Sequence, residues 1–435
     1  MSLVGGRGAS RGVSGAEGRQ AYNRALMLEL VRTRGPLSRS ELGRMGRLNL
    51  AIVSRLAERL ISEGLVREIG TGPSTGGRKP TLLDLIPEAR CAVGVNVGTR
   101  TISLVITDMH GTIRKRAKEP SRMALGPDAL MQQVGDVVHG ALADLPPDLG
   151  EVIGIGMALP APILDPAEST FSPPSYPGWG ELRIGERTED RFGLPVLLDN
   201  DANAAAVGEH LYGAGRGVRD MFYLIAHRGI GGAALVNGAL YRGTHGGAGE
   251  IGHTVIDLDG PRCGCGRYGC LEAFAGRGAI ARRASRALKL AGRQSLAGCE
   301  PGEISAATVI EAGLAGDSLA QRILEETGEY LGLGIVSAVN VLDPEVVVVG
   351  GSTMRAGDLV LEAATRVVRS RALRGLAERV RIVMGELGDD GGAVGAASIV
   401  LRGLFAVPTG ARTAGPAATE LETTGQRRKG ENHDN

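Results

Sequence analysis

The alternation of apolar and polar positions divides the chain into a short N-terminal module and a longer body. Over residues 20–87, apolar residues recur at helical spacing in three segments, and two short strand-like runs follow them. From Cys91 onward, apolar runs end repeatedly in glycine turns, as in 91–98 and 221–232, and Ala-rich helical segments separate them. This pattern predicts an α/β body built from two similar strand-hairpin halves.

The N-terminal module has the pattern of a winged helix-turn-helix. Ser38, with Glu41 three residues later, predicts a capping box at the start of the second helix. Asn49 is the expected cap of a third helix over 50–63, and a hairpin follows. In such a fold the third helix enters the major groove of DNA, and the hairpin, or wing, contacts the DNA backbone or the minor groove. The predicted DNA-contacting residues are Ser38, Asn49, Ser54, Arg55, Arg78 and Lys79.

Charge supports a DNA-binding interpretation of this module. Its basic residues outnumber the acidic ones, which favours DNA over the alternative of a protein-docking domain with a solvated basic face. The net charge of the whole chain is +1, so any nucleic-acid contact must come from a local patch. Aromatic residues make up 3% of the chain, which argues against a base-stacking surface.

Three of the five cysteines lie within one short segment, with a histidine ten residues upstream. Three thiolates and one imidazole form a closed tetrahedral set for structural zinc. Disulfides or incidental core packing are the alternatives. The odd number of cysteines and the lack of an apolar segment near Met1 instead predict a cytoplasmic protein with metal-bound thiols. The predicted zinc ligands are His253, Cys263, Cys265 and Cys270.

Acidic residues flank this cluster and also begin an Ala-rich helix. Glu250 and Glu272 lie on either side of the predicted ligands, where a metal would fix them for a hydroxyl-rich ligand. The segment Asp199-Asn200-Asp201 starts the helix, and helix capping is the simplest reason for such residues there.

Together these motifs resemble those of the ROK family (repressors, open reading frames, kinases). The resemblance rests on 249–253, 263–272 and 199–204, and it covers nearly all of residues 20–405. It implies the two-lobed, ribonuclease H-like α/β fold of sugar kinases and actin-like ATPases. A winged helix-turn-helix is typical of the family's repressor branch.

The resemblance also implies domain boundaries. The winged helix-turn-helix would span 20–87 and the sugar-kinase-like domain 90–405. One lobe would comprise about 90–200 together with a C-terminal helix, 390–403, and the other about 201–389. Residues 1–19 and 408–435 are predicted to be disordered from their polar, glycine-rich composition.

The family's site residues are carried over by position. The zinc ligands are the four already named, and the sugar-contacting residues are Asn200, Asp201, Glu250, His253 and Glu272. In kinase members, the residue at position 201 is the general base for the accepting hydroxyl. The nucleotide loops correspond to Asn96, Gly98, Gly229, Gly231, Gly350 and Gly351.

The phosphate loops depart from the family's kinase pattern. The first loop of kinases reads Asp-x-Gly-Gly-Thr, whereas this chain has Asn96 in place of the acid and Arg100 in place of the hydroxyl residue. The second loop begins with His227 and Arg228 instead of Gly-Thr. Bulky side chains obstruct the close approach of backbone N–H groups to phosphates. The sequence therefore predicts absent or feeble kinase activity, with both arginines as candidates to hold a phosphorylated effector.

The predicted function is that of a sugar-responsive transcriptional regulator, and specifically a repressor. It would bind double-stranded operator DNA as a homodimer, or as a tetramer, and a monosaccharide or sugar phosphate as effector. The alternatives are an active sugar kinase with an added DNA-binding domain, which alone would require ATP and Mg²⁺, and a protein-binding scaffold. No apolar run is long enough to cross a membrane.

Overall fold

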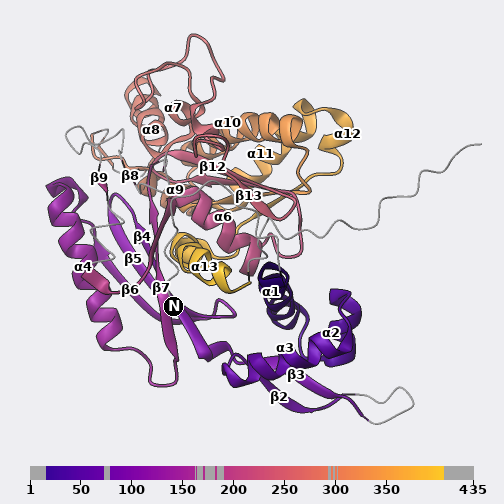
Figure 1. The fold of residues 1–435 in the computed structure, drawn as a ribbon. Coiled ribbons are helices and arrows are strands. Elements are labelled where there is room, and N and C mark those ends of the chain that lie inside the picture. The colour runs from indigo at the N-terminus through magenta and orange to yellow at the C-terminus, as the bar shows by residue number, and fades with distance from the viewer. Residues whose placement is uncertain are drawn as a thin grey trace, which may run out of the picture.

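The computed structural model describes residues 16–72, 79–161, 163, 170–171, 182–183, 191–291, 295–296, 299–300 and 302–405. Figure 1 shows a small N-terminal module beside a body with two α/β lobes. Most of the segments that were predicted to be disordered lie outside the described residues. The exception is 16–19, which belongs to the first helix.

The N-terminal module consists of three helices and a three-stranded sheet of order β1-β3-β2. In chain order it contains α1 (Ala16–Arg34), β1 (Leu37–Ser38), α2 (Arg39–Gly46), α3 (Leu50–Ser62), β2 (Val66–Thr71) and β3 (Thr81–Leu85). The predicted capping box is present, since the Ser38 hydroxyl accepts from the Glu41 N–H and the Glu41 carboxylate accepts from the Ser38 N–H at 2.8 Å. Asn49 caps α3 by accepting from the Ile52 N–H at 2.9 Å.

Helix α1 begins at Ala16, earlier than the expected start of the module at residue 20. Because the first nineteen residues are rich in glycine as a whole, their average composition does not reveal the helix formers among the last four. Ala16, Glu17 and Arg19 are good helix formers and extend the helix by about one turn.

The first lobe is built on a five-stranded sheet of order β10-β7-β4-β5-β6. Its strands are β4 (Arg90–Val97), β5 (Thr101–Asp108), β6 (Ile113–Pro120), β7 (Glu151–Leu159) and β10 (Val196–Asn200). The first three form an antiparallel meander, and the last two add in parallel. The other elements are η1 (Pro87–Ala89), η2 (Met123–Leu125), α4 (Pro127–Ala143), and the paired β8 (Thr170–Phe171) and β9 (Leu182–Arg183).

The second lobe repeats this topology with a sheet of order β13-β12-β11-β14-β15. Its strands are β11 (Met221–Ala226), β12 (Ile230–Val236), β13 (Ala239–Tyr241), β14 (Val346–Gly350) and β15 (Arg381–Met384). Again an antiparallel meander is followed by two parallel strands. The repetition agrees with the two strand-hairpin halves expected from the sequence.

Helices cover the second sheet. They are α7 (Leu271–Ala275), α8 (Arg277–Ala291), α9 (Ala306–Leu314), α10 (Ser318–Leu342), α11 (Asp358–Arg371) and α12 (Arg374–Ala377), with the 3-10 turns η3 (Ile251–His253), η4 (Ser352–Ala356) and η5 (Gly388–Asp390). Helices α10 and α11 pack along each other. Within the described ranges, no helix combines the length and apolar character that a bilayer crossing requires.

Two central helices, α6 (Asp201–Tyr212) and α13 (Gly391–Phe405), connect the lobes. Helix α13 packs on the first sheet at β4 and β7, α6 packs on the second at β11 and β12, and the two helices pack closely together (Figure 1). Gly395 makes this approach possible, because a Cβ there would lie 1.7 Å from the carbonyl oxygen of Ala204. The small residues of both helices therefore serve close packing.

The module and the body share one hydrophobic cluster. Leu28 and Val31 of α1 belong to the same buried cluster as Leu401 and Phe405 of α13, and α1 lies beside α13 in Figure 1. Apolar burial contributes about 25 cal/mol per Å², so this contact attaches the module to the body. The core of the module therefore continues into α13, the last of the described helices.

Candidate metal and ligand site

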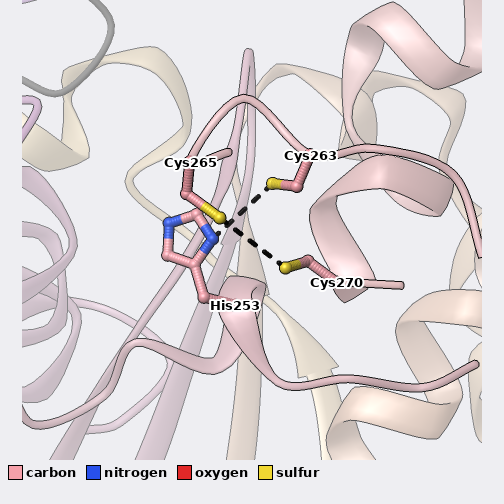
Figure 2. A group of neighbouring side chains, drawn as sticks. All are labelled: His253, Cys263, Cys265 and Cys270. Carbon is pink, nitrogen blue, oxygen red and sulfur yellow. Dashed lines mark hydrogen bonds between the residues drawn. The ribbon is translucent and has the colours of Figure 1, made fainter. Parts of the chain in front are cut away.

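Four side chains that could hold a metal ion, which we call the metal-binding group, converge in the second lobe (Figure 2). The ligand atoms of His253, Cys263, Cys265 and Cys270 all lie within 4.8 Å of one another. The Cys263 Sγ is 3.7 Å from the His253 Nδ1, and the Cys265 and Cys270 sulfurs are 3.7 Å apart. A tetrahedral ion with metal–sulfur distances of about 2.3 Å has edges of roughly 3.8 Å. The group therefore has the donors and the size for such an ion, and its thiols are free.

The local chain path brings these donors together. The Cys263 N–H donates to the Arg267 carbonyl at 2.7 Å and closes a tight loop. Gly269 has a φ of 72°, and a Cβ there would lie 1.8 Å from a backbone carbonyl oxygen of the facing loop. Cys270 then occupies the N-cap position of α7, and His253 is the last residue of η3. Gly269, directly before the third cysteine, thus allows the tight chain path that brings the donors together.

Glu272 links the metal-binding group to the glycine-containing turn between β11 and β12. One of its carboxylate oxygens lies 3.5 Å from the Cys263 Sγ, and the other accepts from the Ile230 N–H at 3.1 Å. Gly229 leaves room for this carboxylate, since a Cβ there would lie 2.2 Å from it. Burial raises the pKa of the Cys263 thiol, with the nearby charge of Glu272 adding to the rise. A bound cation would offset both effects and favour the thiolate.

The predicted sugar-contacting carboxylates form one electrostatic group. Burial raises the pKa of Asp201 to about 6, against a hydrogen bond from the Ala202 N–H, and the charge of Glu250 adds to the rise. Burial also raises the pKa of Glu250; His253 opposes that rise and Glu272 adds to it. The Glu250 carboxylate lies 3.9 Å from the His253 Nε2. The structure therefore gathers these carboxylates next to the metal-binding group.

Asn200 and Asp201 lie where β10 passes into α6. The Asn200 side-chain oxygen caps the helix by accepting from the Ala202 and Asn203 N–H groups. This agrees with the simple capping role considered from the sequence, and it leaves the amide NH₂ of Asn200 as a donor.

The structure adds one pair that the sequence analysis missed. Both oxygens of the fully buried Asp199 accept from Arg242, at 2.7 and 2.5 Å, and one also accepts from the Asn203 amide at 2.9 Å. This pair anchors the end of β10, next to Asn200, to the loop after β13. Asp199 was visible in the acidic segment, but nothing in the local sequence around Arg242 indicated its partner.

The residues matched to the nucleotide loops lie at the ends of strands in both lobes. Asn96 is on β4 and contacts the first turn of α13, where a Cβ on Gly392 would lie 2.7 Å from its amide nitrogen. Gly98 follows the same strand, Gly229 directly precedes β12, and Gly231 is the second residue of β12. Gly350 ends β14, and Gly351 follows it with a φ of 92°.

The predicted DNA-contacting residues differ in accessibility. Asn49 and Arg55 on α3 and Lys79 before β3 are exposed, and Ser54 is half-buried. Ser38 is only 2% exposed and its hydroxyl is engaged in the capping box, so it offers little surface to a partner. Arg78 lies outside the described residues.

The model of the ROK family matches residues 92–402. A xylose repressor of Bacillus subtilis is 31% identical over 382 residues, covering 87% of this chain and 94% of the relative. The DNA-binding transcriptional dual regulator NagC of Escherichia coli is 30% identical over 392 residues, covering 88% of this chain and 93% of NagC. These similarities extend beyond the kinase-like body.

Two solved structures resemble this one. A ROK family transcriptional regulator, described as a homologue of the E. coli MLC protein, has a TM-score of 0.77 at 24% identity and covers 89% of this chain and 97% of its own. A ROK family glucokinase from Streptomyces griseus, in complex with glucose and AMPPNP, has a TM-score of 0.64 at 28% identity and covers 71% of this chain and 98% of its own. With a family model matched over most of its length, the chain belongs to the ROK family.

Proposed function

We propose that this protein is a sugar-responsive transcriptional repressor that uses its N-terminal module to bind operator DNA. The observation that carries this proposal is the extent of the similarity. Relatives named as repressors match 87–89% of the chain, while the glucokinase structure covers 71% of it. The part of the chain that the repressors match and the glucokinase structure does not is comparable in size to the N-terminal module.

The module has the features of a winged helix-turn-helix. Helix α3 buries Val53, Leu56 and Leu60 and exposes Arg55 on its other side. Arg44 at the end of α2 and Arg47 in the turn are also exposed. Within the described residues, no carboxylate forms an ion pair with these three arginines, which leaves them for phosphate or base contacts. Two such modules in a homodimer would read a two-fold operator.

The metal-binding group would hold zinc in a structural role. Three thiolates and one imidazole close the tetrahedron, so no ligand position is left open for catalysis. The ion would fix the loop that carries Glu250 and Glu272. These carboxylates, with Asn200 and Asp201, would accept and donate hydrogen bonds to the hydroxyls of a monosaccharide.

A sugar kinase is the second candidate, because Asp201 occupies the position of the family's general base. Its pKa of about 6 would suit that role at neutral pH. Phosphoryl transfer also requires Mg²⁺ and close backbone contacts to the phosphates. The neutral Asn96 and the bulky His227 replace groups that serve those requirements. We therefore expect no turnover of ATP with any of a panel of sugars; a rate near one per second would favour the kinase.

Two helices provide a route from the ligand site to the module. Helix α6 begins at Asp201 and ends at Tyr212, and the guanidinium of Arg32 on α1 lies 5.8 Å from the centre of the Tyr212 ring. The same guanidinium lies 5.3 Å from the centre of the Phe405 ring at the end of α13. Glu29 holds Arg32 in place through two hydrogen bonds of 2.8 and 2.9 Å. A sugar that shifts α6 would therefore change how α1 is held.

The proposal is tested by fluorescence anisotropy with DNA from upstream of the protein's own gene. We expect salt-dependent binding that is much tighter than to random DNA, and loss of binding with one sugar of a panel that includes xylose and N-acetylglucosamine. Replacing Arg55 by Ala should weaken binding several-fold, whereas replacing the exposed Arg322 of α10 should not. Equal affinity for operator and random DNA would contradict the proposal.

A further inference from the structure

Basic side chains gather where the two glycine loops of the second lobe meet. Ser352 is the first residue of η4 and follows Gly350-Gly351. Its hydroxyl is 2.6 Å from the His227 Nδ1. The same hydroxyl accepts from the Arg277 guanidinium at 3.1 Å. Ser352 thus joins the turn between β11 and β12, the start of α8 and the loop after β14.

Two further arginines lie near this point. Burial lowers the pKa of Arg277, and the positive charges of Arg100 and Arg355 lower it further. Within the described residues, no carboxylate forms an ion pair with any of these three arginines. The nearby acid Asp389 acts on His227, but it also lies 3.7 Å from Lys118. Like charges that are held together without matching acids favour binding of an anion.

The basic residues come from both lobes. Arg100 lies in the turn between β4 and β5 of the first lobe, whereas His227, Arg277 and Arg355 belong to the second. An anion held among them would touch both lobes at once and favour an arrangement in which the lobes are close.

This basic group adjoins the carboxylates described above. Glu272 accepts from the Ile230 N–H, three residues after His227, and it lies in the short helix α7, which ends two residues before Arg277. One continuous segment therefore carries an acceptor for sugar hydroxyls and a cation. A ligand with hydroxyls at one end and an anionic group at the other matches this arrangement.

We propose that Arg100, His227, Arg277, Ser352 and Arg355 form a metal-independent anion site for the phosphate group of a phosphorylated monosaccharide. Guanidinium groups would supply the positive charge that Mg²⁺ supplies in a kinase, and their N–H groups would donate directly to the phosphate oxygens. The inference rests on the proposed function, because it assigns the sugar part of the ligand to the neighbouring carboxylates.

The first test uses inorganic phosphate as the probe. Calorimetry and thermal unfolding of the full chain would be carried out in EDTA, with chloride at matched ionic strength as reference. We expect saturable stabilisation by phosphate in the millimolar range and at least tenfold weaker binding by the Arg277→Gln and Arg355→Gln variants. The Arg322→Gln variant, which changes an exposed arginine on α10, should bind phosphate like the wild type. Phosphate binding that requires Mg²⁺, or that survives both substitutions, would overturn the proposal.

The second test compares sugars with their terminal phosphates. For one pair, the phosphorylated sugar should bind at least tenfold more tightly than the free sugar, and Arg277→Gln should abolish this difference while leaving free-sugar affinity unchanged. Tight binding of a free sugar with no gain from phosphate would refute the anion site and leave the repressor proposal intact. Phosphate binding without any sugar-dependent release of operator would support the anion site and contradict the repressor proposal.

Discussion

At one end of the candidate site, Asp201, Glu250 and Glu272 crowd negative charge beside the metal-binding group. At the other end of this site, Arg100, Arg277 and Arg355 crowd positive charge around Ser352. Both arrangements are unfavourable without a ligand, since like charges at short range repel. The sign of the excess charge differs, so each end indicates the group that would relieve it: hydroxyl donors and a cation at the first, and an anion at the second.

The largest expected effect on this comparison comes from removing one ligand of the metal-binding group. Cys270→Ser should lose the bound ion, and the loop that holds Glu250 and Glu272 should lose its order, because structural zinc binding contributes about 10–16 kcal/mol in small zinc-finger domains. Elemental analysis and calorimetry with sugar would measure both effects. Cys299→Ser is the matched control, since Cys299 lies outside the group. Unchanged sugar affinity in the zinc-free variant would show that the first end does not depend on a metal.

A smaller effect concerns the charge of Asp201. Its folded pKa of about 6 lies above the usual 3.8, so its contribution favours folding at low pH and is lost as the pH rises through about 6. Asp201→Asn should therefore be more stable than wild type at pH 7.5, by about 1–3 kcal/mol, but not at pH 4. It should also bind sugar more weakly.

Urea unfolding of this variant at both pH values would measure the difference. Asp358→Asn, at an exposed position in the first turn of α11, provides the control and should show no such gain. If Asp201→Asn were no more stable than wild type at pH 7.5, crowding of negative charge at the first end would be the wrong explanation.

Coupling between the ends and the module is tested at Arg32. Arg32→Ala removes contacts with two rings and should cost about 1–2 kcal/mol of stability. Its main effect should be on regulation: sugar still binds, but the shift in operator affinity falls at least fivefold. Arg34→Ala, two residues later and exposed, should regulate normally. Operator titrations with and without sugar would distinguish them, and a fully regulated Arg32→Ala variant would rule out this route.

The smallest effect separates helix capping from DNA contact. Asn49→Ala removes the cap of α3 and should cost about 1 kcal/mol of stability as well as operator affinity. Arg55→Ala should weaken operator binding without changing stability, and it should reduce the slope of affinity against salt. Chemical unfolding together with anisotropy would test this. A variant of Arg55 with unchanged affinity at every salt concentration would place the DNA contact elsewhere.

Local patterns predicted much of this molecule. The Ser38 capping box, the Asn49 cap and the cysteine spacing depend on residues a few positions apart, and the structure contains all three arrangements. The repeated strand pattern similarly indicated two lobes, which the sheets confirm.

Long-range pairs could not be predicted in this way. Arg242 meets Asp199 from 43 residues away, and Arg277 meets Ser352 from 75 residues away. Arg32 meets the Phe405 ring across nearly the whole chain. Neither helical nor strand periodicity records such contacts, because they depend on how complete elements pack.

The placement of Arg32 has a consequence for how this protein can change over time. Its two aromatic neighbours end two helices, one of which begins at Asp201 and the other beside Asn96. If both helices transmit movement, a new chemical signal could be acquired at the start of either helix by altering a few local side chains. The connection to the genome would already exist, so recognition and output could evolve separately.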